Sequence, residues 1–327
     1  MKRRLTVRQE SWPLQQPFVI SRLRQETAEL VVVELAQDGL VGRGETERAE
    51  AFDPGAAPVV EEIERVRAEI EQGATRHELL SLLPAGNART AVDCALWDLE
   101  AKAAGRPAWE LAGLEEPGPT STAYTLSLGT PEAMAAEAAR NAARPLLKLK
   151  LGGAGDLERV AAVRAAAPNC RLIADANEGW KDIDLEVFLR GLADLGVALL
   201  EQPLPAGHDA ALAELEHPLP VCADESFRDR ASLAALAGRY DCVNIKLDKA
   251  GGLTEALAAA RAAQAAGFRL MLGCNVGTSL SMAPACLLAG LADFVDLDGP
   301  LLLARDRNPG LTYRGSVITP PTPALWG

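Results

Sequence analysis

Short apolar runs recur along the chain from about residue 120, at intervals near 25 residues. Each run is typical of a buried strand: TAYTLSL, LLKLKL, RLIADAN, ALLEQP, VCADES, CVNIKLD, RLMLGC and FVDLDG. Amphipathic segments such as DLERVAAVRAAAPN and TEALAAARAAQAAGF lie between them and predict helices. A strand–helix unit repeated at this interval predicts a (β/α) barrel with room for eight strands. The rival fold, a doubly wound sheet, lacks the supporting G-x-G-x-x-G motif after the first strand.

Polar residues mark the ends of these runs. The steps are 25, 26, 23 and 22 residues between successive members of the series Lys150, Asp175, Glu201, Asp224 and Lys246. Two further steps of 25 on average lead to Asp296, which is followed by Asp298. Polar residues near the carboxyl ends of barrel strands face the active site in this architecture. The series therefore predicts one site at that end of the barrel.

Residues 1–118 do not follow this repeat and predict an α+β capping domain. Three segments read as antiparallel strands: RLTVRQESWPL, AELVVVELAQDG and LVGRGET. Two helical segments follow, EEIERVRAEIEQ and TAVDCALWDLEAKAAG. The barrel is expected over residues 119–310. The tail, residues 311–327, is too rich in proline for a barrel helix and is expected to return to the cap.

Composition excludes several partner classes. The formal net charge is −12, which argues against a nucleic-acid partner. We find no signal-peptide pattern at the first residues and no apolar run of membrane-spanning length. Six cysteines are scattered without a C-x-x-C pair, as expected for reduced thiols in a cytoplasmic protein. The three histidines form no cluster, so a histidine metal site or a Ser-His-Asp triad has little support.

Lysine is rare in this chain, and its placement is informative. Only 7 of the 33 cationic residues are lysines. Lys148 and Lys150 nevertheless stand two apart in the apolar run LLKLKL, where residues two apart share a strand face. Lysine can lose its proton when it is desolvated or placed near another cation, whereas arginine cannot. Lysines in apolar runs are therefore candidates for proton transfer, the alternative being snorkelling or salt-bridged side chains.

Three carboxylates end consecutive strands: Asp175, Glu201 and Asp224. Together they form a hard oxygen site that suits Mg²⁺, unless each merely caps the helix that follows. Lysines on the flanking strands suit removal of a proton α to a carboxylate, with the metal stabilising the enediolate. A lysine base needs a depressed pKa, which Lys148 and Mg²⁺ would supply to Lys150.

The chain strongly resembles the enolase superfamily, in its muconate-lactonizing subgroup. The motifs that carry the resemblance are GRGET, AVDCALWDLEAKAAGRP, K-x-K, DAN, EQP, ADES and NIKLDKAGGL. Within the subgroup, the D-x-D of VDLDGP resembles the mark of the dipeptide epimerases. The resemblance implies a (β/α)7β modified TIM barrel under an N-terminal α+β cap. It implies inversion of a dipeptide's second residue by two-lysine 1,1-proton transfer.

The resemblance also implies individual roles. Lys150 and Lys246 would be the two acid/base residues, Lys148 would support the enediolate, and one Mg²⁺ would be bound by Asp175, Glu201 and Asp224. Asp296 and Asp298 would hold the α-ammonium of the dipeptide, which paired buried anions can do chemically. Glu225 and Asn177 are candidates for supporting the metal ligands. Asp248 has no clear role, and a structural salt bridge is the default expectation.

The substrate is expected to be an Ala-Glu dipeptide of the kind found in peptidoglycan. In the family, the loop SRLRQE (Ser21–Glu26) covers the substrate. Arg24, or Arg22, could therefore pair with an acidic side chain on the second residue, or be a solvated surface arginine. The sequence leaves a homo-oligomer open.

Three other functions compete. A muconate cycloisomerase or o-succinylbenzoate synthase of the same subgroup would act on a substrate without an ammonium group, for which the D-x-D has no use. A catalytically inactive barrel acting as a binding protein should have lost one of the lysines or acids. A phosphate-binding barrel enzyme would use GCNVGTS as its anion site, but the nearby D-x-D would repel phosphate.

Overall fold

A computed structural model describes residues 3–52 and 55–327. Residues 1–2, which include Lys2, and residues 53–54 belong to the expected cap but lie outside the described residues. The cap contains an antiparallel sheet in the order β1-β2-β3, formed by β1 (Arg4–Ile20), β2 (Leu23–Gln37) and β3 (Leu40–Glu47). The three expected cap strands are confirmed.

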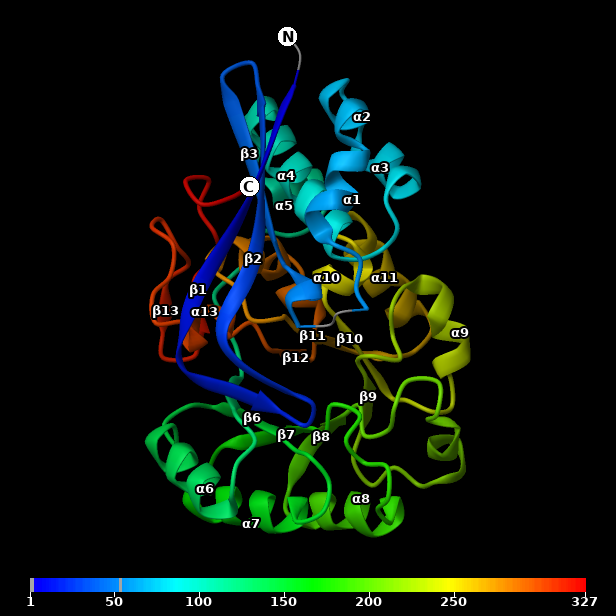
Figure 1. The fold of residues 1–327 in the computed structure, drawn as a ribbon. Helices are drawn as coiled ribbons and strands as arrows, with labels where there is room; N and C mark the ends of the chain where they lie inside the picture. Colours follow the sequence, from blue (N-terminus) through cyan, green and yellow to red (C-terminus); the bar gives the residue numbers. More distant parts are fainter. Residues whose placement is uncertain (1–2, 53–54) are drawn as a thin grey trace.

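The first two strands are much longer than the sequence predicted. After an irregularity between Pro13 and Phe18, pairing resumes and continues to Ile20 opposite Leu23. The expected loop Ser21–Glu26 is therefore wrong: it is a tight turn followed by the start of β2. Apolar residues on both sides of the turn favour this pairing over an irregular loop. Figure 1 shows the resulting hairpin reaching from the cap to the barrel loops.

Helices follow the sheet in the cap. They are η1 (Ala49–Ala51), α1 (Val59–Arg65), α2 (Arg67–Glu71), α3 (Arg76–Leu82), α4 (Asn87–Ala104) and α5 (Ala108–Leu111). The expected helix over EEIERVRAEIEQ is two helices, because the backbone leaves the helical region at Val66, with φ −111° and ψ 14°. Helix α3 was not predicted, although a capping box between Thr75 and Glu78 marks its start.

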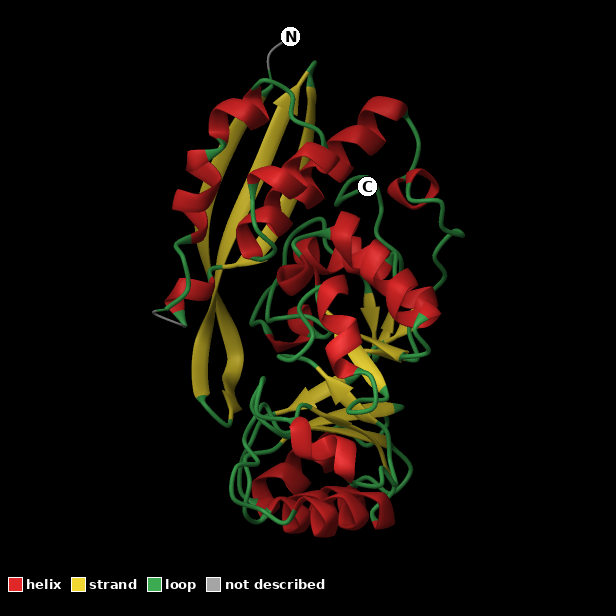
Figure 2. Ribbon diagram, turned by 90° about the vertical axis from the view of Figure 1, so that its right-hand side faces the viewer, coloured by secondary structure: helices red, strands yellow, loops and turns green. Residues whose placement is uncertain are grey.

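Two glycines of GRGET let helix α4 lie directly on strand β3. A Cβ atom at Gly42 would stand 2.2 Å from the Ala95 carbonyl oxygen, and one at Gly44 would stand 2.1 Å from that of Ala91. No side chain fits in either place. The motif thus fixes the helix against the sheet (Figure 2).

The barrel is confirmed. Among the described residues, eight parallel strands form one curled sheet in chain order. They are β5 (Tyr124–Leu126), β6 (Leu146–Lys150), β7 (Arg171–Asp175), β8 (Val197–Glu201), β9 (Val221–Ala223), β10 (Cys242–Ile245), β11 (Arg269–Leu272) and β12 (Phe294–Val295). The covering helices are α6 (Pro131–Arg140), α7 (Asp156–Ala166), α8 (Leu185–Asp194), α9 (Leu233–Leu236), α10 (Leu247–Ala250), α11 (Leu253–Ala265), α12 (Ser279–Cys286) and α13 (Gly299–Leu302).

Short 3-10 helices complete this layer: η2 (Ala210–Glu214), η3 (Arg230–Ser232) and η4 (Ala289–Leu291). The link from β8 to β9 contains η2 in place of an α-helix. The first and last strands meet where Ala123 N donates to Val295 O at 2.8 Å, which closes the barrel. The interior below the site is filled by apolar side chains from successive strands: Leu146, Ile173, Leu199, Cys222, Cys242, Met271 and Phe294.

The tail contacts both parts of the molecule. β13 (Tyr313–Arg314) pairs with β14 (Val317–Ile318), which pairs with β4 (Thr120–Ser121) before the first barrel strand. Trp326 Nε1 then donates to the Cys94 carbonyl oxygen of α4 at 3.0 Å. Division into a cap of residues 1–118 completed by 311–327, and a barrel of residues 119–310, remains our proposal.

Candidate active site

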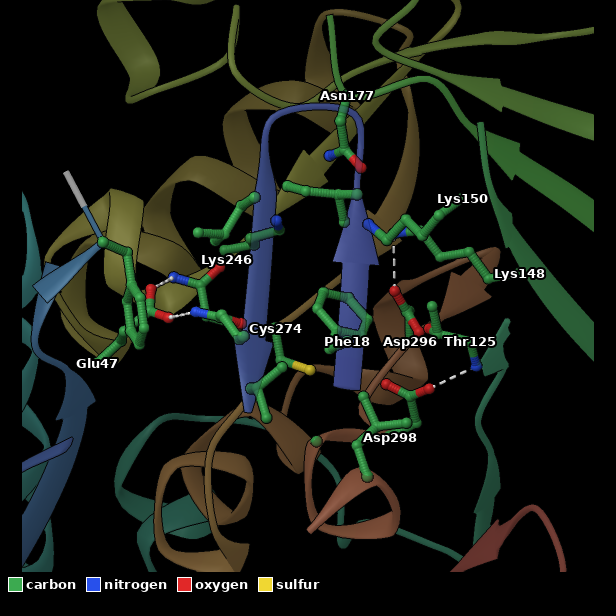
Figure 3. Close-up of a pocket in the computed structure, with 18 of the residues that line it drawn as sticks. Phe18, Glu47, Thr125, Lys148, Lys150, Asn177, Lys246, Cys274, Asp296 and Asp298 are labelled. Atoms are coloured by element: carbon green, nitrogen blue, oxygen red, sulfur yellow. Dashed lines mark hydrogen bonds and ion pairs between the residues drawn. The ribbon is translucent and has the colours of Figure 1, made fainter. Parts of the chain in front are cut away.

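A pocket of about 550 Å³ lies between the cap and the carboxyl ends of the barrel strands (Figure 3). Phe18 and Glu47 of the cap line it, together with the three lysines and the two aspartates singled out in the sequence: Lys148, Lys150, Lys246, Asp296 and Asp298. In Figure 3, Lys246 lies on one side of the pocket, and Lys148 and Lys150 lie on another. Sequence-distant lysines and acids therefore meet in one place.

Strand β6 places its two lysines in the barrel interior. Leu147 and Leu149 pack into the layer between barrel and helices. Leu146 points to the opposite side, into the barrel interior. Since side chains alternate along a strand, Lys148 and Lys150 continue the interior face above Leu146. This placement takes two ammonium groups out of water, which requires partners for their charge.

The partners are the strand-end carboxylates. Lys148 Nζ lies 2.7 Å from Glu201 Oε2, 2.8 Å from Asp296 Oδ2 and 3.1 Å from Asp175 Oδ2. Burial alone would lower the pKa of Lys148, but Asp296, Glu201 and Asp175 raise it well above its ordinary value. The carboxylates around Lys148 therefore favour its charged form. Lys150 Nζ donates to Asp175 Oδ2 at 2.6 Å.

Lys246 follows β10 directly and reaches the site from the other side. Its Nζ donates to Asp224 Oδ2 at 2.8 Å, while Lys249 Nζ lies 2.5 Å from Asp224 Oδ1. Burial would lower the pKa of Lys246, but Asp224 and Glu201 raise it above its ordinary value. Lys246 therefore lacks the depressed pKa that a lysine base needs while these carboxylates face it.

The strand-end acids are the candidate ligands for a cation. In the described part of the chain, no three His, Cys, Asp or Glu side chains are grouped closely enough to hold a metal as they stand. Ammonium groups lie among the acids instead. The donor chemistry nevertheless fits a hard cation. Burial, followed by the charges of Asp175 and Asp224, raises the pKa of Glu201 to about 7, and a divalent cation would relieve that repulsion.

The D-x-D lies at the end of β12. Asp298 occupies the first position before α13 but makes no capping hydrogen bond there. It accepts a hydrogen bond from Thr125 N at 2.6 Å instead. Burial and the charge of Asp296 raise the pKa of Asp298 to about 7. Asp296 Oδ1 is buried without a hydrogen-bond partner in the described structure, so this pair has unused capacity to bind a cation.

The two candidate arginines of the hairpin differ in their surroundings. Arg22 lines the main pocket and pairs with Glu178 and Glu225, each at 2.8 Å. Arg24 lies outside that lining, because it alternates along β2 with Leu23 and Gln25, which line the main pocket. It lines a neighbouring hollow of about 290 Å³ that shares Phe18, Thr125 and Leu302 with the main pocket. Its partner Glu26 lies at 3.3 Å in an exposed pair.

The remaining candidates have defined contacts. Glu225 pairs with Arg22, while the Asn177 carbonyl oxygen accepts from Ser21 Oγ at 2.8 Å. Both therefore tie the hairpin to the barrel. Asp248 accepts a hydrogen bond from Thr46 Oγ1 at 2.5 Å, which replaces the expected salt bridge.

Sequence reasoning missed several polar residues of the site. Asn244 Nδ2 donates to Glu201 Oε1 at 2.6 Å from inside β10. The sequence could have indicated Asn244, because it stands two residues before Lys246 and therefore shares its strand face. Glu47 accepts a hydrogen bond from Gln25 within the cap and another from Asn275 across the boundary between cap and barrel. No sequence pattern marks these contacts, because they depend on how the two parts pack.

Two known families match this chain, one in each part of the sequence. Residues 2–113 match the family described as mandelate racemase / muconate lactonizing enzyme, N-terminal domain. Residues 133–323 match the family described as enolase C-terminal domain-like. The chain belongs to the enolase superfamily. Its two matched regions are those of the mandelate racemase and muconate lactonizing enzyme family, which confirms the resemblance of the motifs.

Two curated relatives within the superfamily are similar over most of the chain. The L-Ala-D/L-Glu epimerase of Escherichia coli K12 is 49% identical over 313 residues, covering 95% of this chain and 98% of that protein. The N-acetyl-D-glutamate racemase of a Pseudoalteromonas species is 49% identical over 251 residues, covering 76% of this chain and 79% of that protein.

A solved structure shares the fold closely. It is an enolase family member from Agrobacterium tumefaciens with homology to dipeptide epimerases, with bound sodium and L-Ala-L-Glu. It has a TM-score of 0.97 and 49% identity, covering 99% of this chain and all of that one. The barrel with its cap is therefore the superfamily fold.

Proposed function

We propose that this protein is an Mg²⁺-dependent dipeptide epimerase that inverts the second residue of L-Ala-L/D-Glu. The arrangement that carries the proposal is a buried aspartate pair placed in one pocket with lysines on two sides. The pair can hold an ammonium group, and the lysines can exchange a proton at a nearby carbon. Similarity to the E. coli epimerase and to the Agrobacterium structure with L-Ala-L-Glu supports the same substrate class.

The lysines divide the proton transfer between them. Lys150 removes the α-proton from one face of the second residue. Lys246 then donates a proton from its Nζ to the other face of the same α-carbon. Lys148 stays charged and stabilises the negative charge that develops on the substrate carboxylate. The buried setting strengthens each of these interactions.

Asp175, Glu201 and Asp224 would hold Mg²⁺. When bound, the cation would neutralise charge on the substrate carboxylate. These carboxylates are also partners of the three lysines, so ligation of a cation would weaken their pull on the ammonium groups. For Lys246, loss of that pull would bring its raised pKa back down, as a base requires.

A second candidate is racemisation of N-acetylglutamate. The Pseudoalteromonas relative supports it, and the two substrates share glutamate at the reacting centre. They differ in the ammonium group, which N-acetylglutamate lacks. The unused Asp296 Oδ1 favours the dipeptide, because a buried anion with free capacity suits an ammonium group better than an acetyl methyl group.

Asp298→Asn is the substitution that distinguishes the two candidates. The asparagine carbonyl oxygen can still accept from Thr125 N, so the variant removes charge and keeps the local hydrogen bond. We expect kcat/KM for L-Ala-L-Glu to fall about 10²-fold, while any turnover of N-acetyl-L-glutamate changes little. Wild-type preference for N-acetyl-L-glutamate, unaffected by this variant, would instead establish the second candidate.

Arg24 is proposed to recognise the acidic side chain of the second residue. An exposed ion pair such as Arg24–Glu26 contributes only about 0–1 kcal/mol, so the guanidinium is available to a ligand. We expect Arg24→Ala to lower the preference for L-Ala-L-Glu over L-Ala-L-Gln by about 10-fold or more in kcat/KM. Arg22→Ala is the matched control, because Arg22 is held by two barrel carboxylates. Loss of the preference in the control alone would reassign the role to Arg22.

Peptides released from peptidoglycan are the proposed source of the substrate, and the cytoplasm is the proposed location. All six cysteines are free in the structure, as the reducing compartment requires. No helix in the described residues is long and apolar enough to cross a membrane.

A further inference from the structure

The segment that follows Lys246 is held by the cap. Lys246 itself stands immediately before α10, with its side chain in the pocket. Helix α10 has only four residues and lies near α4 in the fold (Figure 1). Such a short helix is not stable by itself. Its contacts with other parts of the protein therefore help to set the position of Lys246, which precedes it.

One contact is a chain of hydrogen bonds with a fixed direction. Asn87 Nδ2 donates to Thr46 Oγ1 at 3.0 Å, and Thr46 Oγ1 donates to Asp248 Oδ1 at 2.5 Å. The direction is fixed because an amide NH₂ only donates and a carboxylate only accepts. Thr46 is fully buried, so its hydroxyl has no water to replace either partner. We call Asn87, Thr46 and Asp248 the cap relay.

Helix α4 makes two further contacts with the same segment. Thr90 Oγ1 donates to the Leu247 carbonyl oxygen at 2.7 Å. Arg89 Nη2 donates to the Ala250 carbonyl oxygen at 2.7 Å. The backbone on both sides of Asp248 is thus bound to the cap, and the two anchors lie within four residues of Lys246.

Lys150 is positioned differently. In the described structure, the hydrogen bonds that hold the backbone after Lys150 come from barrel residues. Leu151 N donates to the Asp175 carbonyl oxygen at 2.8 Å. Gly153 N donates to Asp156 Oδ2 at 2.7 Å, and Asp156 also accepts from Trp180 Nε1 at 2.7 Å. From the described part of the cap, Phe18 makes a ring contact, with Lys150 Nζ 5.7 Å from the centre of its ring.

We propose that the cap relay is a positioning device for Lys246 and not for Lys150. The cap thereby sets the efficiency of proton transfer on one face of the α-carbon only. Thr46, Asn87 and Asp248 are positioning residues, since they act through the backbone that carries Lys246. This inference rests on the proposed two-lysine epimerisation.

Thr46→Val tests the inference, because it removes the hydroxyl and keeps the side-chain shape. Initial rates of α-deuterium incorporation in D₂O with Mg²⁺ are measured separately for L-Ala-L-Glu and L-Ala-D-Glu. Lys246→Ala first shows which isomer depends on Lys246. We expect Thr46→Val to lower exchange in that isomer about 10-fold to 100-fold and to leave the other within about 3-fold. Thr46→Ser, which keeps the hydroxyl, should restore the wild-type ratio.

Thr254→Val is the matched control. Thr254 Oγ1 accepts from Trp97 Nε1 at 2.9 Å and donates to Asp93 Oδ1 at 2.5 Å, so it forms an equivalent chain at the same interface. It lies at the start of α11, further from Lys246. Loss of general stability should appear in both variants, whereas the isomer ratio should change only in Thr46→Val.

The outcomes separate two failures. Equal loss of exchange in both isomers, or no loss in either, would overturn the positioning role of the relay. Absence of exchange in both isomers for the wild type would overturn the proposed function and the inference with it. Should Thr46→Val fail to fold, Asp248→Asn serves instead, because it leaves one acceptor oxygen for the two cap donors, Thr46 Oγ1 and the Glu47 amide. The same one-sided loss is expected.

Discussion

Replacing Lys150 or Lys246 by alanine is expected to abolish epimerisation while leaving α-proton exchange in one isomer. Inversion needs a proton to leave from one face and to arrive at the other, so both lysines are required. A positioned acid/base group typically contributes about 10²-fold to 10⁴-fold to the rate, and we expect inversion to fall by at least that factor. Family resemblance assigns Lys150 to the L,L isomer and Lys246 to the L,D isomer. Deuterium incorporation without inversion measures the remaining lysine.

Lys181→Ala is the control for the loss of a lysine. Lys181 follows Trp180 in the loop after β7 and is exposed. We expect wild-type inversion from this variant. Near-normal inversion in Lys246→Ala would show that one base acts on both faces, and that Lys246 only provides charge. Loss of all exchange in both lysine variants would instead indicate that each ammonium group is needed to hold the carboxylates in place.

Removal of divalent ions is expected to abolish turnover, and Mg²⁺ should restore it. The three strand-end acids repel one another: burial, followed by the charges of Asp175 and Asp224, raises the pKa of Glu201 to about 7. Charge stabilisation by a bound metal is typically worth several kcal/mol, so EDTA treatment should lower kcat at least about 10³-fold. Glu201→Gln and Asp175→Asn should each lose most activity. The two variants should also lose the rise in Tm that Mg²⁺ gives the wild type.

Asp241→Asn is the matched control for these acids. Asp241 lies at the amino end of β10, where it pairs with His217 at 2.8 Å. This variant should lose some stability and keep both the Mg²⁺-dependent rise in Tm and the activity. Full activity of the wild type in metal-free buffer would contradict the assignment of Asp175, Glu201 and Asp224 as metal ligands.

The barrel and the place of its site were predictable from local pattern. Each apolar run matched one strand, because alternation along β6 and the regular step between runs are properties of the sequence itself. Lys150, Asp175 and Glu201 are the last residues of their strands, so the site's edge could be read directly.

Features that depend on packing were not predictable in the same way. The hairpin is not evident from the sequence, because Ser21 and Arg22 look like loop residues, yet the apolar stretch before them pairs with the residues after them. The break at Val66 has no glycine or proline to announce it. The hydrogen bond between Thr46 and Asp248 joins residues 202 positions apart. It forms only when α4 and β3 pack against the barrel, so no local sequence pattern predicts it.

The most direct measurement of the central claim is isotope exchange at a defined carbon. The protein is incubated with Mg²⁺ and L-Ala-L-Glu in D₂O, and the products are read by mass spectrometry and chiral separation. We predict one deuterium at the α-carbon of the glutamate, none at that of the alanine, and formation of deuterated L-Ala-D-Glu. Recovery of L-Ala-L-Glu with its α-protons intact, from a protein shown to bind Mg²⁺, would contradict the account.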